Sequence, residues 1–316
     1  MKKKRNSFGL LGVWVALVVA IQVAIHKLIF WLGNRKLEDT EPYEMFDWKE
    51  GYVAYHTSGS GRPLLLLHHT SVGGSHMEWE KNMDFLSQHY KVYAIDLPGF
   101  GASEKPKLTY TVYQYALFLN AFIEQQVKQP VSIIASSASA DFALMAYLLN
   151  PKNMEKLVLI SPTGMKTDLA TPADNKRRKF LQAPLLGTHC FLMATSKKSI
   201  RLHLENDLFF SKEKVPRELV DAYYTAAHTG GESARFAYAS TTSHFTDVNI
   251  RKALESLKIP FLVVWGEKNL SNPITYIREI EKLRPDGEYA IFEETRLLPH
   301  YENSEKFNPL IKEFLN

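Results

Sequence analysis

Four consecutive leucines, Leu64–Leu67, impose the strongest constraint on how this chain can fold. Such a short, continuous apolar run is typical of a strand that is buried on both faces of a sheet. Similar runs recur at 92–95, 131–134, 157–160 and 261–265, and helical stretches separate most of them. Strands that alternate with helices predict an α/β fold, in which a mostly parallel sheet is flanked by helices.

The remaining pattern divides this α/β region further. Helices are expected at 79–88, 112–127, 140–149, 273–284 and 304–315. Residues 48–56 alternate between apolar and polar side chains and predict a strand, and Ser58–Gly61 is typical of a hairpin turn. Residues 165–250 read as amphipathic helices without clear strands, so we expect a helical cap inserted into one domain of residues 48–316.

An apolar segment at residues 8–25 has Gln22 as its single polar side chain. About 20 such residues in a helix span the hydrocarbon core of a membrane. A signal peptide has a core of about 7–15 residues and a small-x-small cleavage site, which Val18–Ala20 matches poorly. We therefore expect a membrane anchor at 1–36 and a polar linker at 37–47. A cleaved signal peptide and a buried helix are the alternatives.

The basic residues are concentrated in this N-terminal segment. The chain has 38 Lys and Arg and 34 Asp and Glu, a formal charge of +4. Seven basic and no acidic residues lie in 1–36, which leaves 31 basic against 34 acidic residues in the rest. This mildly acidic remainder argues against nucleic acid as a partner. The four charges at Lys2–Arg5 predict a single-pass cell-membrane protein with a cytoplasmic N-terminus and an extracytoplasmic domain.

Cysteine and histidine patterns predict neither a metal site nor a cofactor. Cys190 is the single cysteine, so it has no intramolecular disulfide partner. No cluster of cysteine and histidine has zinc-ligand spacing. We expect Cys190 to be a buried, inert thiol.

Four motifs resemble those of the α/β-hydrolase superfamily, and they occur in the right order over residues 48–316. They are Leu-Leu-Leu-Leu-His-His at 64–69, Asp-Leu-Pro-Gly-Phe-Gly-Ala-Ser at 96–103, Ser-Ala-Ser at 137–139 and Val-Val-Trp-Gly-Glu at 263–267. The resemblance implies the α/β-hydrolase fold, a Ser–acid–His triad, an oxyanion hole and a helical cap.

The nucleophile and the oxyanion hole are assigned by this resemblance. Ser137 takes the nucleophile position, in a stretch where the family has Gly-x-Ser-x-Gly and this chain has small Ala and Ser residues. The oxyanion hole is implied to use the backbone N–H groups of Thr70 and Ala138. Where the family has His-Gly after the strand, this chain has His68 and His69.

The acid and base positions carry different chemistry. The resemblance places Asn269 at the acid position and Leu297 at the base position. An amide can orient an imidazole but cannot balance its charge, and leucine cannot accept a proton. Loss of the base in a serine triad costs about 10⁶ in kcat. We therefore expect a pseudo-hydrolase that binds a ligand or a partner.

The alternative is a serine esterase or lipase that cleaves an acyl ester through Ser137 with a relocated base. His300, three positions after Leu297, is the first candidate for that base. The further candidates are His69, His76, His189, His203, His228 and His244. Glu267 and Asp168 are candidates for a displaced acid. A non-catalytic scaffold whose cap contacts another membrane protein is a third alternative.

The expected partners follow from these assignments. They are membrane lipid at the N-terminal helix and a small acyl ligand or a protein partner at the site. The basic run 175–180 (Asn-Lys-Arg-Arg-Lys-Phe) lies beside apolar Leu181. It is interpreted as a solvated helix face or as a contact with anionic lipid. Asp96 is expected to hold the 96–103 loop in place.

Overall fold

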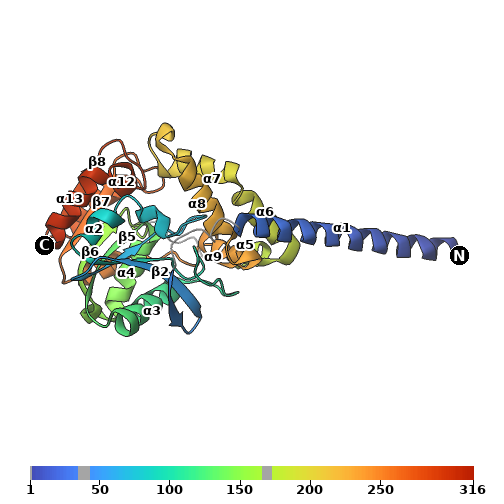
Figure 1. The fold of residues 1–316 in the computed structure, drawn as a ribbon, viewed down its shortest axis with the longest axis horizontal. Helices are drawn as coiled ribbons and strands as arrows, with labels where there is room; N and C mark the ends of the chain where they lie inside the picture. The colour runs from blue at the N-terminus through green and yellow to red at the C-terminus, as the bar shows by residue number, and fades with distance from the viewer. Residues whose placement is uncertain (1, 35–42, 166–172) are drawn as a thin grey trace.

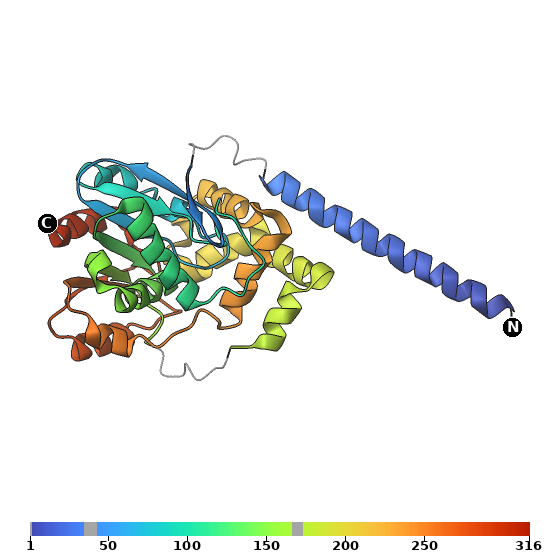
Figure 2. The same cartoon turned by 90° about the horizontal axis from the view of Figure 1, so that it is seen from below.

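The computed structural model describes residues 2–34, 43–165 and 173–316. Asp168 and most of the predicted linker lie outside these residues. The sheet of the described residues has eight strands in the order β1-β2-β4-β3-β5-β6-β7-β8 (Figures 1 and 2). The strands are β1 (Glu44–Trp48), β2 (Gly51–Ser58), β3 (Pro63–Leu67), β4 (Lys91–Ile95), β5 (Val131–Ser136), β6 (Met154–Ile160), β7 (Phe261–Gly266) and β8 (Glu288–Phe292).

Pairing is parallel from β4 through β8 and antiparallel at β1 and β2. The predicted mostly parallel α/β fold is therefore confirmed. The side chains of β3 alternate between the two faces, with Leu65 and Leu67 in one core cluster and Leu64 and Leu66 in the other. This arrangement explains why the whole strand is apolar.

Helices cover both faces of the sheet. One face packs against α3 (Val112–Phe122), which continues as η3 (Ile123–Val127), and against α4 (Ala138–Leu149), α10 (Arg251–Ser256) and α11 (Thr275–Leu283). The other packs against α2 (Met83–Ser87) and α13 (Ser304–Leu315). The short helices η2 (His76–Trp79), η4 (Pro151–Asn153) and α12 (Pro299–Glu302) lie in connections.

The cap lies between β6 and β7. Its helices are α5 (Asn175–Gln182), α6 (Pro184–Ala194), α7 (Lys197–His203), η5 (Leu204–Leu208), η6 (Lys212–Lys214), α8 (Arg217–His228), η7 (Gly231–Ala234) and α9 (Arg235–Thr242). The cap follows the carboxyl end of β6, and the loop before α12 follows the carboxyl end of β8. Because parallel strands end at the same edge of the sheet, the cap and this loop leave from the same edge.

The structure corrects the expectation for the first strands. The predicted strand at 48–56 is part of a hairpin, in which β1 and β2 turn at Lys49 and Glu50. β1 begins at Glu44, inside the predicted linker, because Phe46 and Trp48 are buried against α3. Ser58–Gly61 is not a hairpin turn, since β2 pairs with β4 and not with β3.

The N-terminal helix α1 (Lys2–Asn34) extends away from the domain (Figures 1 and 2). Its part from Gly12 to Asn34 contains an 18-residue stretch with a mean hydropathy of 2.2 and is long and apolar enough to cross a membrane. By length and composition this helix fits an anchor or a signal sequence. Its last turns pack on the cap, with the Phe30 ring 5.6 Å from the His228 ring and 6.3 Å from the Phe191 ring.

Candidate functional site

The turn between β5 and α4 forces Ser137 into an unusual backbone conformation. Its φ and ψ angles are 58° and −126°, in a region that favours glycine. Conformations of this kind cost about 1–3 kcal/mol and persist where the surrounding structure holds them. A hydrogen bond from the Ser137 N–H to the carbonyl of Ile160, at 2.8 Å, fixes the turn to β6. The half-buried Ser137 hydroxyl thus stands at the carboxyl edge of the sheet.

Two backbone donors flank this position. Within the described part of the chain, neither the N–H of Thr70 nor that of Ala138 has a hydrogen-bond acceptor. The loop of Thr70 is tied to the turn because the Ser139 hydroxyl donates to the His68 carbonyl at 2.5 Å. Two unpaired N–H groups on adjoining segments are what stabilisation of an oxyanion requires. Their assignment as an oxyanion hole stays a prediction.

The His68 side chain is fixed by backbone partners on both ring nitrogens. Nδ1 donates to the His69 carbonyl at 2.7 Å, and Nε2 accepts from the Leu97 N–H at 3.0 Å. Burial lowers the pKa of His68, which keeps its ring neutral. This residue therefore braces the loop and has no nitrogen left for chemistry.

The side-chain oxygen of Asn269 is fully used within its own turn. Oδ1 accepts from the N–H groups of Ser271 at 3.0 Å and Asn272 at 3.1 Å. Nδ2 is buried and has no partner in the described structure. The loop lies against the segment before Leu297, since a Cβ on Gly266 would come within 1.8 Å of the Arg296 carbonyl. The predicted acid and base positions are thus on adjoining loops.

Leu297 is buried in a hydrophobic cluster that the core shares with the cap. The cluster contains Leu297 and Leu298 from the core and Leu204, Leu208, Phe209, Leu219 and Tyr223 from the cap. The Leu297 N–H donates to the Leu208 carbonyl at 3.2 Å. Glu302 reinforces this contact by accepting from the N–H groups of Arg296 and Phe210, each at 2.7 Å. Packing with the cap therefore fixes Leu297, and its place at the base position stays a prediction.

Sequence reasoning missed the fully buried Glu78, which lies between two histidines. Its Oε2 accepts from the His69 N–H at 2.8 Å and from His69 Nδ1 at 2.5 Å. Its Oε1 is 2.9 Å from His300 Nε2. Although burial favours the neutral form, the two imidazoles hold the pKa of Glu78 well below its usual value. The sequence holds no signal for this contact, because Glu78 and His300 are far apart in the chain.

His300, the first candidate for a relocated base, is stacked on Trp79 with ring centroids 4.4 Å apart. It is fully buried and is directed to Glu78. Within the described structure, no hydrogen bond links any side chain to the Ser137 hydroxyl. The structure thus places His300 in the Glu78 cluster, and its role as a base stays a prediction.

In two other candidate histidines, a carboxylate holds Nδ1 while Nε2 is buried without a partner in the described structure. Glu78 holds Nδ1 of His69, and Asp207 holds Nδ1 of His203 at 2.7 Å. In both rings Nε2 is buried and has no partner in the described residues. A carboxylate on Nδ1 and an open Nε2 are the arrangement that orients the histidine of a serine triad.

The remaining candidate histidines have other neighbours. His76 Nδ1 lies 3.0 Å from Asp96, and the His189 ring lies 6.0 Å from that of His26. His228 donates from Nδ1 to the Tyr224 carbonyl at 2.6 Å, and His244 pairs with Asp247 at 2.9 Å. Glu267 pairs with Lys268 at 3.3 Å. None of these contacts reaches Ser137.

Asp96 organises the 96–103 loop. Its carboxylate accepts from the N–H groups of His76 at 2.6 Å and Ala102 at 2.7 Å. Although burial favours the neutral acid, the His76 imidazole, with smaller contributions from His68 and the Ala102 N–H, holds the pKa of Asp96 below its usual value. Gly101, with φ of 49°, is required here because a Cβ would lie 2.1 Å from the Asp96 carboxyl carbon. The buried Lys105 amino group donates to the Gly101 carbonyl at 2.6 Å, and burial lowers its pKa to about 8.

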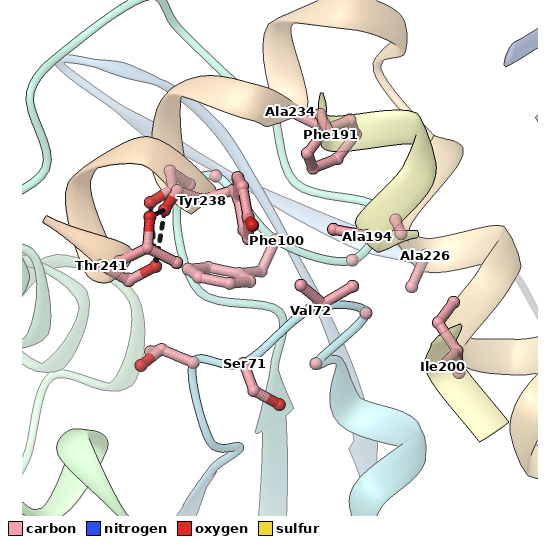
Figure 3. A pocket seen from close by; sticks show the side chains of 18 of the residues that line it. Ser71, Val72, Phe100, Phe191, Ala194, Ile200, Ala226, Ala234, Tyr238 and Thr241 are labelled. Carbon is pink, nitrogen blue, oxygen red and sulfur yellow. Dashed lines mark hydrogen bonds between the residues drawn. The ribbon is translucent and has the colours of Figure 1, made fainter. Parts of the chain in front are cut away.

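A cavity of about 230 Å³ lies between the Thr70 loop and the cap (Figure 3). Its wall is mainly apolar and includes Val72, Phe100, Phe191, Ala194, Ile200 and Ala226. The titratable residues in this wall are Lys105, His203 and Tyr238. Thr70 also lines the cavity, whereas Ser137 and Leu297 do not. In the described part of the chain, no group of three His, Cys, Asp or Glu residues is placed to hold a metal ion.

We expect Ser137→Gly to unfold with a free energy about 1 kcal/mol larger than that of Ser137→Ala, because alanine keeps the backbone strain and glycine removes it. Urea denaturation followed by circular dichroism measures the difference. The same pair at Ser132, in the extended strand β5, is the control and should show the opposite order. Equal unfolding free energies of the two Ser137 variants would show that the backbone at this position is not strained.

We expect Glu78→Gln to lower the free energy of unfolding by about 3 kcal/mol at pH 7, because it removes one partner of a buried charged cluster. The pKa of Glu78 is lower in the folded state, so its stabilisation is present above the unfolded pKa and is lost as pH falls. The difference in unfolding free energy between the variant and the wild type should therefore become smaller below pH 4.5. Glu213→Gln, at an exposed position, is the control. A difference in unfolding free energy that stays constant down to pH 3 would refute the pairing of Glu78 with the two histidines.

Comparison with known proteins identifies the family to which this fold belongs. The family described as alpha/beta hydrolase fold matches residues 63–303. The pimeloyl-[acyl-carrier protein] methyl ester esterase of Aliivibrio fischeri is 23% identical over 269 residues, covering 83% of this chain and 96% of the relative.

Two solved structures are similar throughout their lengths. A serine hydrolase involved in carbazole degradation has a TM-score of 0.73 at 21% identity and covers 87% of this chain and 99% of its own. A membrane phospholipase A has a TM-score of 0.70 at 19% identity and covers 100% of this chain and 98% of its own. At these identities the likeness shows the fold. Together with the family match over residues 63–303, it establishes that the chain belongs to the alpha/beta hydrolase fold family.

Proposed function

We propose that this chain is a membrane-anchored ligand-binding protein built on the α/β-hydrolase fold, with no conventional triad hydrolysis. The observation that carries the proposal is the burial of Leu297 in the cluster shared with the cap. A leucine side chain cannot accept the proton of Ser137. The side-chain oxygen of Asn269 already accepts hydrogen bonds from two N–H groups of its own turn. The strained turn at Ser137 then serves to shape the site.

The ligand we propose is a small acyl compound. The apolar wall of the cavity suits a hydrocarbon chain, and Lys105 and His203 suit a polar or anionic end group. The A. fischeri relative is named for an acyl ester, which supports the same chemical class. A protein partner at the cap is the competing occupant.

Anchoring through α1 is part of the proposal. Four positive charges at Lys2–Arg5 precede the apolar segment, which favours a cytoplasmic N-terminus and an extracytoplasmic domain. The membrane phospholipase A structure covers all of this chain, the apolar helix included. That likeness supports an anchor over a cleaved signal sequence.

Ligand binding is tested with a dansyl-labelled undecanoic acid, whose fluorescence rises in an apolar site. We expect saturable binding by the full chain and at least a tenfold weaker affinity in Ala194→Trp, because tryptophan fills the cavity. Leu202→Trp is the control, since Leu202 lies on the neighbouring helix α7 and is exposed outside the cavity. Equal binding by both variants would place the acyl group elsewhere, and no binding by the wild type would favour the protein partner.

The second candidate function is acyl-ester hydrolysis with a relocated base. The observation that favours it is the pair of imidazoles, His69 and His203, that have a carboxylate on Nδ1 and an unpartnered Nε2. His203 also lines the cavity. In such a mechanism the base would take the Ser137 proton as the hydroxyl attacks the ester carbonyl, and would return it to the leaving alcohol.

One experiment separates the two candidate functions. A fluorophosphonate probe and p-nitrophenyl butyrate are applied to the wild type and to Ser137→Ala. Under our first proposal labelling is slow, and Asn269→Asp with Leu297→His raises it at least 100-fold. Rapid, stoichiometric labelling of wild-type Ser137 would overturn that proposal. His69→Gln, His203→Gln and His300→Ala then identify the base, and unchanged turnover in any of them removes that histidine.

A further inference from the structure

Helix α6 of the cap has two faces with different surroundings. Phe191 and Ala194 on its inner face line the cavity, as Figure 3 shows. On its outer face, Leu186 and Met193 are each 61% exposed. Apolar side chains this exposed are common singly, but here two of them share one face of α6, and Met193 lines a groove beside the docked part of α1.

A groove of about 700 Å³ runs between α1 and the α6–α7 segment. One wall is formed by Val18, Ile21, Ile25 and Ile29 of α1, and the other includes Leu192 and Met193 of α6. Val18, Ile21 and Ile25 belong to the apolar segment that is proposed to lie in the membrane. Because α6 side chains share a groove with these residues, this part of the cap is at the same level as the end of the membrane segment.

The groove has polar groups as well as apolar ones. Gln22, His26, His189, Ser196 and Ser199 line it together with the apolar residues. His26 is 7% exposed and its ring lies 6.0 Å from that of His189. A groove with both kinds of side chain suits a phospholipid, which has apolar acyl chains and a polar headgroup.

Positive charge adjoins this surface on α5, the helix before α6. Lys176, Arg177 and Lys179 are exposed, whereas Arg178 turns inward and donates to Thr109 at 2.9 Å. Phe180, at the end of the same run, is 49% exposed. Figure 2 shows that these cap helices, in yellow-green, lie at the end of the domain from which α1 departs. Lysine and arginine beside exposed apolar side chains are complementary to an anionic lipid surface.

We propose that the membrane rim of the cap, defined as α5, α6 and the groove along α1, is seated in the lipid surface. Leu186 and Met193 then contact acyl chains, phospholipid occupies the groove, and the α5 cations face anionic headgroups. The proposal rests on the anchoring role of α1 and adds that the cap itself is a lipid-contacting element.

The test measures the depth of single fluorescent probes in lipid nanodiscs that contain phosphatidylglycerol. Full-length protein with Cys190→Ser receives one cysteine, at Leu186 or Met193, and is labelled with NBD. Leu149 provides the matched control, because it is 45% exposed and lies at the end of α4, on the opposite edge of the sheet. A fourth probe at Trp14 reports on the membrane segment itself.

We expect doxyl-labelled phospholipid to quench the probes at Leu186 and Met193 at least threefold more than the probe at Leu149. Quenching at Trp14 without excess quenching at Leu186 and Met193 would refute lipid contact by the cap, while membrane insertion of α1 would still hold. Absence of quenching at Trp14 would overturn the anchor as well.

A charge-reversal series tests the contribution of α5. Replacing Lys176, Arg177 and Lys179 by glutamate should reduce quenching at Leu186 in anionic nanodiscs and change it little in phosphatidylcholine nanodiscs. Glutamate at Lys128, Lys152 and Lys252 applies the same charge change at exposed positions away from the rim. An equal effect of the two sets would show that net charge alone is responsible and would refute lipid contact by α5.

Discussion

The strained turn at Ser137 is the constraint on which the site depends. β5 passes into α4 through one residue, and this passage sets where the helix begins and which backbone N–H groups remain unpaired. The Ser139 hydroxyl then ties α4 to the loop after β3, and His68 ties that loop to the one after β4. Three loops at the carboxyl edge of the sheet are thereby held together, and the cavity lies between two of them, those after β3 and β4, and the cap.

On the opposite side of the site, local contacts support the two residues at the predicted acid and base positions. An imidazole at position 297 would need a polar partner in a buried place. Leucine needs none, and it adds to the cluster that joins the core to the cap. The amide at Asn269 likewise satisfies its oxygen locally by capping the turn at Ser271 and Asn272. Both side chains therefore support the local backbone.

Sequence patterns predicted those parts of the structure that depend on neighbouring residues. The leucines of β3 are buried on both faces, so they carry no alternation and mark a central strand. Ser137, Asn269 and Leu297 could be located because each follows a strand within a short, recognisable motif. The strand β1 was not predicted, since Phe46 and Trp48 gain their burial from α3, far along the chain. Glu78 and the cavity wall were missed for the same reason: their contacts join distant segments, and the amphipathic cap helices carry no mark of which face lines a cavity.

The packing of α1 on the cap has a mechanical consequence. Phe191 packs against Phe30 of α1 and also lines the cavity, so α1 and the cavity share a wall. A tilt of α1 in response to bilayer thickness would press on that wall through Phe30 and His228. If α1 spans a membrane as proposed, the thickness and lateral pressure of the bilayer would influence the volume of the cavity.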